Sequence, residues 1–510
     1  MAGLNRRQRQ AVETIDGPLL VVAGPGTGKT QLLSARAANI LAKTDAAPGN
    51  VLCLTFTDNA ARNMRERLVD MIGRPAYHVA IHTFHSFGAE IISQYPDYFT
   101  SRQLLQQVDE LGRYELLKEI FESLPHSDPL SAKAGDNFVF INDVLDVISW
   151  LKQNAVTPAQ LKAFLKANRA AIDALAADLA DAFFETPRPK FLLKYQKFLR
   201  KLRQVTSGKL ILGFADFAAL AAGELADAIS QTGDAGRYAP RITAWRNRWC
   251  QKDETGATVF KDAGRNYRKM RALADIYEEF MASLAAQGLY DFDDMVMEAV
   301  GALENDPQLR SNLQERYLYV LVDEFQDTNK AQLRMLSALG DNPVFEGRPN
   351  LMAVGDDDQA IYAFQGAEAS NMAAFAKLYS LEPVVLTENY RSDAAILETA
   401  EAVAGQISDR LDAVAPASGK HLSAAKSFPI KELDYLSFAS ELAQYDWIAA
   451  EIERLIKTGT PPEQIGVIAP RHRYLERLMP YLGDRKIPVV YERRENILEA
   501  PLIVQLTSMA

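Results

Sequence analysis

The sequence predicts an α/β fold in which short, buried strands of a parallel sheet alternate with helices. Continuous apolar runs lie within residues 19–23, 51–57 and 317–327, and helix-prone stretches follow the first two. Such runs suit strands that are covered on both faces. Between about residues 98 and 287, Leu, Ala, Lys and Glu recur at helical spacing instead. We therefore expect a parallel α/β core that carries a large, mainly helical insertion.

Composition limits the class of protein. At 510 residues, the chain can form about three or four domains, each with its own core. Its two cysteines indicate a reducing compartment, and its start, MAGLNRRQRQ, lacks the apolar core of a signal peptide, so we expect a cytoplasmic protein. A net charge of −10 does not predict a nucleic-acid binder, so any such surface must be local.

A glycine-rich loop follows the first apolar run. Its glycines let the backbone N–H groups turn toward an anion, and the helix start adds its positive end. In such a loop, Lys29 reaches the β- and γ-phosphates and the Thr30 hydroxyl binds Mg²⁺. Ala23 replaces the usual first glycine. The predicted phosphate-binding residues are Ala23, Gly24, Pro25, Gly26, Thr27, Gly28, Lys29 and Thr30.

Two further segments end in polar and aromatic groups. Phe56 closes the run at 51–57, at the sheet edge where open α/β sheets present their ligands. Residues 81–87, IHTFHSF, are predicted as a third short strand. For Phe56 and Phe84, local sequence leaves two interpretations open, core packing or contact with a base or phosphate.

Two basic stretches lie in the helical region, at residues 188–204 and 237–271. The second interleaves Tyr238, Trp245, Trp249 and Tyr267 with arginines. Basic groups neutralise phosphates and aromatic rings stack on bases, which suits nucleic acid. A solvated helix face with core tryptophans explains the same pattern, and the sequence does not separate the two.

The run at 317–327, YLYVLVDEFQD, ends in paired carboxylates. A strand-end Asp323 can hold Mg²⁺ and Glu324 can activate water; two solvated turn carboxylates are the alternative. Residues 351–367 predict another strand that leads to Gln359, placed to sense a terminal phosphate. The three aspartates at 356–358 predict a turn with helix capping, because three successive residues cannot easily converge on one ion. Strands are also predicted at 465–470 and 487–492.

Taken in order, these motifs resemble the UvrD/Rep/PcrA family of superfamily 1 DNA helicases. The matching segments are LNRRQRQAV, AGPGTGKT, TFTDNAARNM, TFHSF, YDFDDMV, VDEFQDTN, VGDDDQAIYAFQGA, TENYRS and IGVIAPR. The resemblance implies two RecA-like phosphate-loop core domains. It divides the chain into residues 1–97 and 288–378 of the first core domain, a helical insertion at 98–287, and an incomplete second core domain at 379–510.

The resemblance also implies roles for single residues. Gln8 would read adenine and Tyr390 would stack on it. Glu324 would be the catalytic base, Gln359 would contact the γ-phosphate, and Arg391 would act as an arginine finger. Thr30 and Asp323 would hold Mg²⁺ beside ATP. Phe56, Thr83, His85, Tyr362 and Phe364 would line the single-strand DNA track.

The implied function is an ATP-dependent 3′→5′ single-stranded DNA translocase and helicase that unwinds duplex DNA in repair, recombination or replication restart. Repair or recombination proteins are the implied partners. The chain stops at Ala510, before the family's later motifs, so we expect an N-terminal fragment of a longer protein. A nucleotide-gated DNA-binding fragment or scaffold without unwinding activity is the alternative. A small-molecule kinase is a third, but it would not need the aromatic series.

Overall fold

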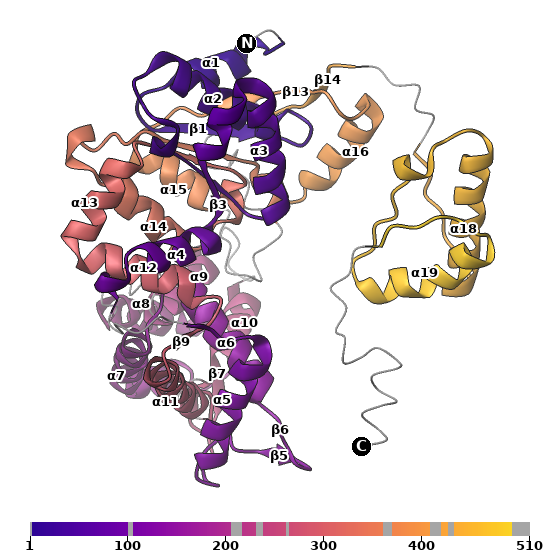
Figure 1. Ribbon diagram of the computed structural model, residues 1–510. Helices are drawn as coiled ribbons and strands as arrows, with labels where there is room; N and C mark the ends of the chain where they lie inside the picture. The colour runs from indigo at the N-terminus through magenta and orange to yellow at the C-terminus, as the bar shows by residue number, and fades with distance from the viewer. Residues whose placement is uncertain are drawn as a thin grey trace. The chain divides into compact units, whose positions relative to one another are not determined.

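The computed structural model describes residues 3–99, 106–205, 217–230, 238–261, 265–360, 370–407, 420–426 and 433–491 (Figure 1). The chain divides into two compact units, Met1–Pro429 and Ile430–Ala510. Each unit is described by itself.

A six-stranded sheet lies at the centre of the first unit, in the order β12-β1-β11-β10-β2-β3, and every pairing in it is parallel. Its strands are β1 (Leu19–Ala23), β2 (Val51–Thr55), β3 (Ala80–Thr83), β10 (Tyr319–Val322), β11 (Leu351–Gly355) and β12 (Val384–Leu386). All residues of β1, β2, β10 and β11 are buried, as expected for strands covered on both faces. The predicted α/β class is confirmed.

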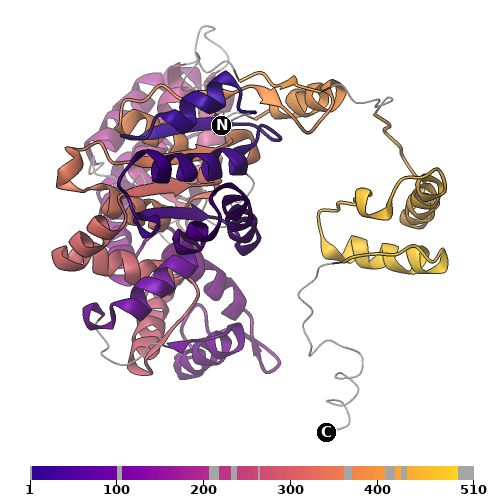
Figure 2. The same cartoon turned by 45° about the horizontal axis from the view of Figure 1, so that its top comes forward.

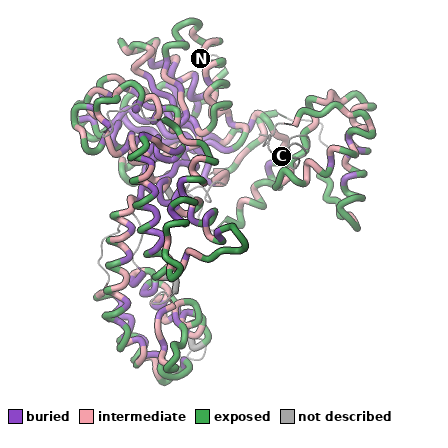
Figure 3. Tube along the Cα trace, turned by 60° about the horizontal axis from the view of Figure 1, so that its bottom comes forward, coloured by how far each residue is buried: buried purple, intermediate pink, exposed green. Residues whose placement is uncertain are grey.

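Helices cover both faces of this sheet (Figure 2). Alternate residues of β1 enter different cores, with Leu20 and Val22 on one face and Leu19 and Val21 on the other. One face packs against α1 (Arg6–Glu13), α2 (Lys29–Lys43) and α3 (Asp58–Ile72). The other packs against α4 (Phe84–Gln94), α12 (Asp294–Asn305), α13 (Pro307–Arg316), α14 (Lys330–Gly340) and α15 (Ser370–Leu378). Figure 3 shows buried segments concentrated in these layers.

The helical region forms two further cores. The first joins α5 (Glu110–Ser123), α6 (Ile141–Gln153), the start of α7 (Pro158–Ala182) and α11 (Arg265–Ala286). The second joins the rest of α7 to α8 (Leu192–Val205), α9 (Phe217–Ser230) and α10 (Tyr238–Trp249). Short strand pairs accompany them: β4 (Gln106–Gln107) with β9 (Leu289–Tyr290), β5 (Lys133–Ala134) with β6 (Asn137–Phe138), and β7 (Cys250–Lys252) with β8 (Thr258–Phe260). The β4–β9 pair brings the two ends of the helical region together.

The aromatic residues of the basic stretch at 237–271 are partly core. Trp245 is 3% exposed and stacks on Phe183, with ring centroids 5.2 Å apart. The indole N–H of the half-buried Trp249 donates to Glu224 at 2.8 Å. A buried ring cannot stack on a base, so the core interpretation holds for Trp245.

The C-terminal boundary of one predicted strand needs correction. The predicted strand at 81–87 ends at Thr83, because the Thr83 hydroxyl accepts from the N–H of Ser86 and starts α4. β12, which lies in the predicted second core domain at 379–510, is hydrogen-bonded to β1 of the six-stranded sheet. Beyond it, β13 (Glu388–Asn389) and β14 (Ser423–Ala424) form a separate parallel pair, with α16 (Ala394–Ala404) between them in sequence.

The second unit has a small core between α18 (Glu441–Lys457) and α19 (His472–Asp484). The strands predicted at 465–470 and 487–492 are not formed over residues 465–470 and 487–491, and residue 492 lies outside the described ranges. Both runs are largely apolar, but a strand also requires a hydrogen-bonded neighbour, and the described part of this unit supplies none. Within the described ranges, every helix of the protein is too short or too polar to cross a lipid bilayer.

Candidate nucleotide site and nucleic-acid interface

The phosphate-binding loop connects β1 to α2 in the predicted way. Gly26 and Gly28 have positive φ of 71° and 87°, a conformation that favours glycine. The buried Thr27 hydroxyl donates to the carbonyl of Gly24 at 2.7 Å and closes the loop. Gly28 is the N-cap of α2 and has no side chain to cover the first turn. The N–H groups at this helix start therefore suit an anion.

The acidic strand end lies directly opposite the loop. Lys29 Nζ and Glu324 Oε2 are 2.6 Å apart, although 294 residues lie between them in the sequence. Glu324 follows β10 with φ 48° and ψ 47°, the left-handed region in which a non-glycine residue is strained. That strain indicates a conformation that the surrounding structure imposes, and it brings the carboxylate to the loop lysine.

Asp323 is buried, and its backbone N–H donates to Leu54 of the neighbouring strand. Burial, together with the adjacent Glu324 carboxylate, raises the pKa of Asp323 to about 6. A carboxylate placed in this way favours a cation beside it, and carboxylate and hydroxyl oxygens are ligands that Mg²⁺ prefers. Thr30, the other predicted ligand, lies in the first turn of α2. The donor set therefore fits a magnesium ion.

Gln359 joins this group from the end of β11, in a short 3-10 helix (Asp357–Gln359). Its Oε1 accepts from Lys29 Nζ at 3.4 Å, and its Nε2 donates to Asp356 Oδ2 at 2.5 Å. Gln326 connects the end of β10 to the end of β11. Its Nε2 donates to Glu324 at 3.0 Å, and its Oε1 accepts from the N–H of Asp356 at 2.9 Å. Sequence analysis did not single out Gln326.

The three aspartates at 356–358 form an acidic turn, which confirms one prediction and corrects the reason given for it. Asp356 caps the 3-10 helix by accepting from the N–H of Asp358 at 3.3 Å, as predicted. The three successive carboxylates nevertheless do converge on one cation, the ammonium group of Lys420. They can do so because the turn brings their side chains to one side of the backbone.

The two residues predicted to hold adenine lie beside the loop. Gln8 Nε2 donates to the carbonyl of Thr27 at 2.9 Å, and its Oε1 accepts from the N–H of Asn5 at 3.0 Å. The Tyr390 hydroxyl accepts from Asn5 Nδ2 at 3.0 Å. Both ends of the Gln8 amide are thus engaged within the protein, so reading a base would require exchange of these hydrogen bonds.

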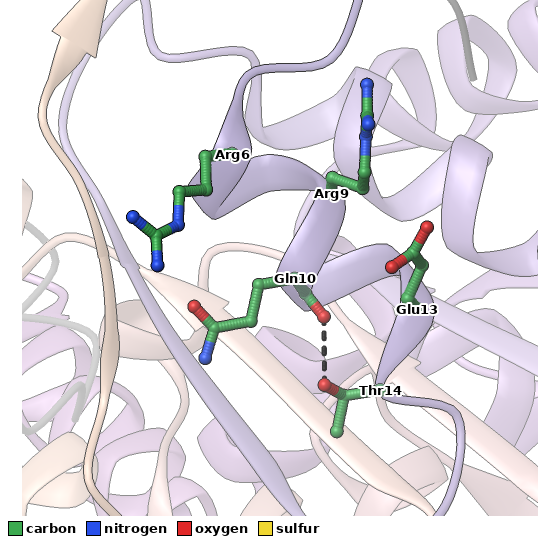
Figure 4. A pocket seen from close by; sticks show the side chains of 5 residues that line it. All are labelled: Arg6, Arg9, Gln10, Glu13 and Thr14. Atoms are coloured by element: carbon green, nitrogen blue, oxygen red, sulfur yellow. Dashed lines mark hydrogen bonds between the residues drawn. The ribbon is translucent and has the colours of Figure 1, made fainter.

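Ala11 and Val12 of α1 are buried in the core with Gln8, and other residues of the helix line a hollow. Figure 4 shows a shallow hollow along α1 that is lined by Arg6, Arg9, Gln10, Glu13 and Thr14. The Thr14 hydroxyl donates to the backbone carbonyl of Gln10 at 2.8 Å. None of these five is a predicted site residue.

Asn389, which sequence analysis also missed, fixes the segment that carries Tyr390 and Arg391. Its Nδ2 donates to the carbonyl of Pro25 at 2.5 Å, and its Oδ1 accepts from the N–H of Arg391 at 2.8 Å. The Tyr390 N–H donates to Gly26 at 2.9 Å. The predicted finger Arg391 therefore has its backbone against the phosphate-binding loop.

Three of the predicted DNA-track residues lie at the ends of adjacent strands. Phe56 follows β2, and Thr83 ends β3, where its hydroxyl is used to cap α4. His85 on α4 stacks on Phe292, with ring centroids 3.9 Å apart, and burial lowers the pKa of His85. Phe292 is 49% exposed and adds a ring that the motif at 290–296 contained but the sequence analysis did not select. Tyr362 and Phe364 lie outside the described residues.

The fold and this site define a phosphate-loop protein whose nucleotide would lie among the ends of β1, β10 and β11. Residues 4–380 match the UvrD/REP helicase N-terminal domain, and residues 384–505 match the UvrD-like helicase C-terminal domain. The chain belongs to the UvrD/REP helicase family, which confirms the resemblance seen in its motifs.

Several curated proteins are similar over most of the chain. The ATP-dependent DNA helicase PcrA of Bacillus subtilis is 28% identical over 460 residues, which cover 90% of this chain and 46% of that protein. PcrA of Staphylococcus aureus strain Mu50 is 25% identical, and the match covers 96% of this chain and 52% of that protein. The ATP-dependent DNA helicase UvrD1 of Mycobacterium bovis is 28% identical, and the match covers 93% of this chain and 51% of that protein. The chain spans about half the length of these relatives.

Proposed function

We propose that this chain binds and hydrolyses ATP as part of a 3′→5′ single-stranded DNA translocase and helicase that unwinds duplex DNA. The observation that carries the proposal is the convergence of Lys29, Glu324 and Gln359 beside a loop against which Tyr390 and Arg391 also lie. The names of the similar proteins, which are ATP-dependent DNA helicases, support the choice of nucleotide and track. Family membership speaks against the small-molecule kinase.

The Lys29–Glu324 ion pair suggests how phosphate binding activates the site. Phosphate oxygens compete with Glu324 for the Lys29 ammonium, and phosphates held by the loop favour the exchange. Glu324 is then released to accept a proton from the attacking water. Gln359 contacts the terminal phosphate, and the Arg391 guanidinium stabilises the charge that develops on it.

Thr30 and Asp323 would hold a magnesium ion in this scheme. A bound magnesium ion neutralises charge on the phosphate oxygens. The buried Asp323 supports this assignment, because burial and the adjacent Glu324 raise the pKa of its carboxylate, and a bound cation would favour the charged form.

Movement along DNA requires that grip on the strand changes with the nucleotide. Opening a base-pair step costs about 1.4 kcal/mol, and one aromatic stack returns roughly 1–3 kcal/mol per base. Stacking on the His85–Phe292 pair can therefore hold a separated base, but it gives no direction. Direction would come from hydrolysis at the site between the loop and the Arg391 segment.

We keep the predicted domain organisation as part of the proposal, with one adjustment. The β4–β9 pair supports an insertion that leaves and re-enters the first core domain near residues 98 and 287. The pairing of β12 with β1 supports a start of the second core domain after Leu386 rather than at 379.

The test is ATP hydrolysis by the purified chain with and without single-stranded DNA. We expect stimulation by DNA, and loss of hydrolysis in Lys29→Ala but not in Lys43→Ala, which changes an exposed lysine at the other end of α2. An ATPase rate that is the same with and without DNA would contradict the translocase in this chain. Binding of nucleotide and DNA with negligible turnover would instead support the nucleotide-gated scaffold.

A further inference from the structure

Lys420 is a buried lysine surrounded by carboxylates. Its side chain is 4% exposed, and its Nζ contacts Asp356 Oδ1, Asp357 Oδ1 at 2.7 Å and Asp358 Oδ2 at 2.9 Å. The Asp356 and Asp357 side chains are 0% and 2% exposed. The cluster raises the pKa of Lys420 to about 12 despite burial, so the cation is retained.

A continuous series of contacts connects Lys420 to the candidate catalytic residues. Asp356 accepts from Lys420 through Oδ1 and from Gln359 Nε2 through Oδ2. Gln359 in turn accepts from Lys29, which pairs with Glu324. The orientation of the Gln359 amide is therefore set from one side by a carboxylate that Lys420 holds.

Lys420 reaches this turn from the segment that leads into β14. β14 pairs with β13, whose Asn389 donates to the phosphate-binding loop. Leu422 also lies against the loop, since a Cβ built on Gly24 would be 2.8 Å from its Cδ1. The β13–β14 pair and its flanks thus contact both the loop and the acidic turn.

We propose that Lys420 is a positioning residue that orients Gln359 toward the terminal phosphate and couples this orientation to the position of the β13–β14 pair. The inference rests on the proposed function, in which Gln359 contacts that phosphate. Withdrawal of the β13–β14 pair would remove the ammonium group from three adjacent carboxylates. Like charges without a cation repel at short range in a buried site, so the turn would rearrange and carry Gln359 with it.

The experiment is a double-mutant comparison of Lys420→Met, Gln359→Ala and the double variant. We expect each single variant to lower kcat for ATP by about tenfold or more, and to lower the ratio of ATP to ADP affinity, measured with fluorescent nucleotides. Because Lys420 acts through Gln359, the double variant should be no worse than the poorer single variant. Lys420→Arg should recover part of the activity, since it keeps the charge.

Lys426→Met is the matched control, because it makes the same change at an exposed lysine six positions further on. If Lys420→Met does not fold, Asp357→Asn/Lys420→Met replaces it, since that variant leaves fewer uncompensated carboxylates. Losses that multiply in the double variant, or a folded Lys420 variant with unchanged kcat and affinity ratio, would overturn the proposal. The affinity ratio needs no DNA, so it tests Lys420 even if DNA fails to stimulate the wild-type ATPase and the proposed function fails.

Discussion

Lys29 and Glu324 form a 2.6 Å ion pair between the phosphate-binding loop and the end of β10. In the proposed function, Lys29 binds a nucleotide phosphate and Glu324 activates the attacking water. The ion pair engages both groups with each other instead. Under the proposed function, each group would therefore restrain the other until phosphate binds.

Glu324→Gln should separate nucleotide binding from hydrolysis. The amide preserves the shape of the side chain but is a poor base, so we expect ATP affinity to be retained or slightly increased and kcat to fall by about 100-fold or more. Fluorescent-nucleotide titration and steady-state kinetics measure the two effects. Glu346→Gln is a suitable control, because Glu346 is an exposed glutamate with nearly the same φ, 49°. Equal kcat in both variants would contradict the assignment of the base.

Gly26→Ala should displace the segment that carries Arg391. A Cβ on Gly26 would lie 2.6 Å from Asn389 Nδ2 and 2.8 Å from the Arg391 Cβ, in addition to the strain of a positive φ. We expect a stability loss of about 1 kcal/mol from the backbone and a loss of ATP hydrolysis from the displaced arginine.

Gly347→Ala separates these two effects. Gly347 has a similar φ of 77°, but among the described residues its added Cβ would meet nothing within 4 Å. Thermal unfolding should show destabilisation in both variants, whereas hydrolysis should fall only in Gly26→Ala. Full activity in a folded Gly26→Ala would exclude a close approach of the Arg391 segment during turnover.

The parts of the site that sequence predicted are those that depend on local pattern. Five-residue apolar runs determine β1 and β11, and glycines at 26 and 28 occur where the backbone has positive φ. Strand ends in a parallel sheet lie along one edge, but the shared site of Asp323 and the loop was expected from the family resemblance.

The residues that sequence missed depend on contacts between distant segments. Asn389 bonds to Pro25 across 364 positions, and Lys420 reaches Asp357 across 63. Nothing in the residues around Lys420 indicates that its charge is buried. The strands predicted at 465–470 and 487–492 were wrong over their described residues for a related reason, since apolar pattern specifies an extended chain but not its partner.

Phe292→Ala and His85→Ala should weaken single-stranded DNA binding while ATP binding stays intact. Their stacked rings offer a platform for a base, and the loss of one aromatic stack corresponds to about 1–3 kcal/mol, or roughly 5- to 150-fold in affinity. Fluorescence anisotropy with a labelled oligonucleotide measures this. Phe184→Ala removes an exposed ring, 80% accessible, from the helical region and should have no such effect. An unchanged DNA affinity in Phe292→Ala would remove this residue from the track.

Lys152 should be a major stabilising residue at the junction of the insertion and the first core domain. Lys152 lies on α6 and is fully buried, and its Nζ is 2.8 Å from Asp291 and 2.7 Å from Asp294. The side chain of each of these aspartates accepts a hydrogen bond from the backbone N–H of the other at the start of α12. Lys152→Met removes the cation that both carboxylates share, while Arg113 Nε still lies 3.3 Å from Asp291 Oδ2, so we expect a loss of about 3–5 kcal/mol in the free energy of unfolding, measured by urea denaturation. Lys118→Met, at a half-exposed lysine 3.9 Å from Glu122, should cost about 1 kcal/mol or less. Equal unfolding midpoints for the two variants would contradict this role. A loss of stability in Lys152→Met alone would identify the cluster of Lys152, Asp291 and Asp294 as the connection that fixes the helical insertion to the segment that carries Phe292.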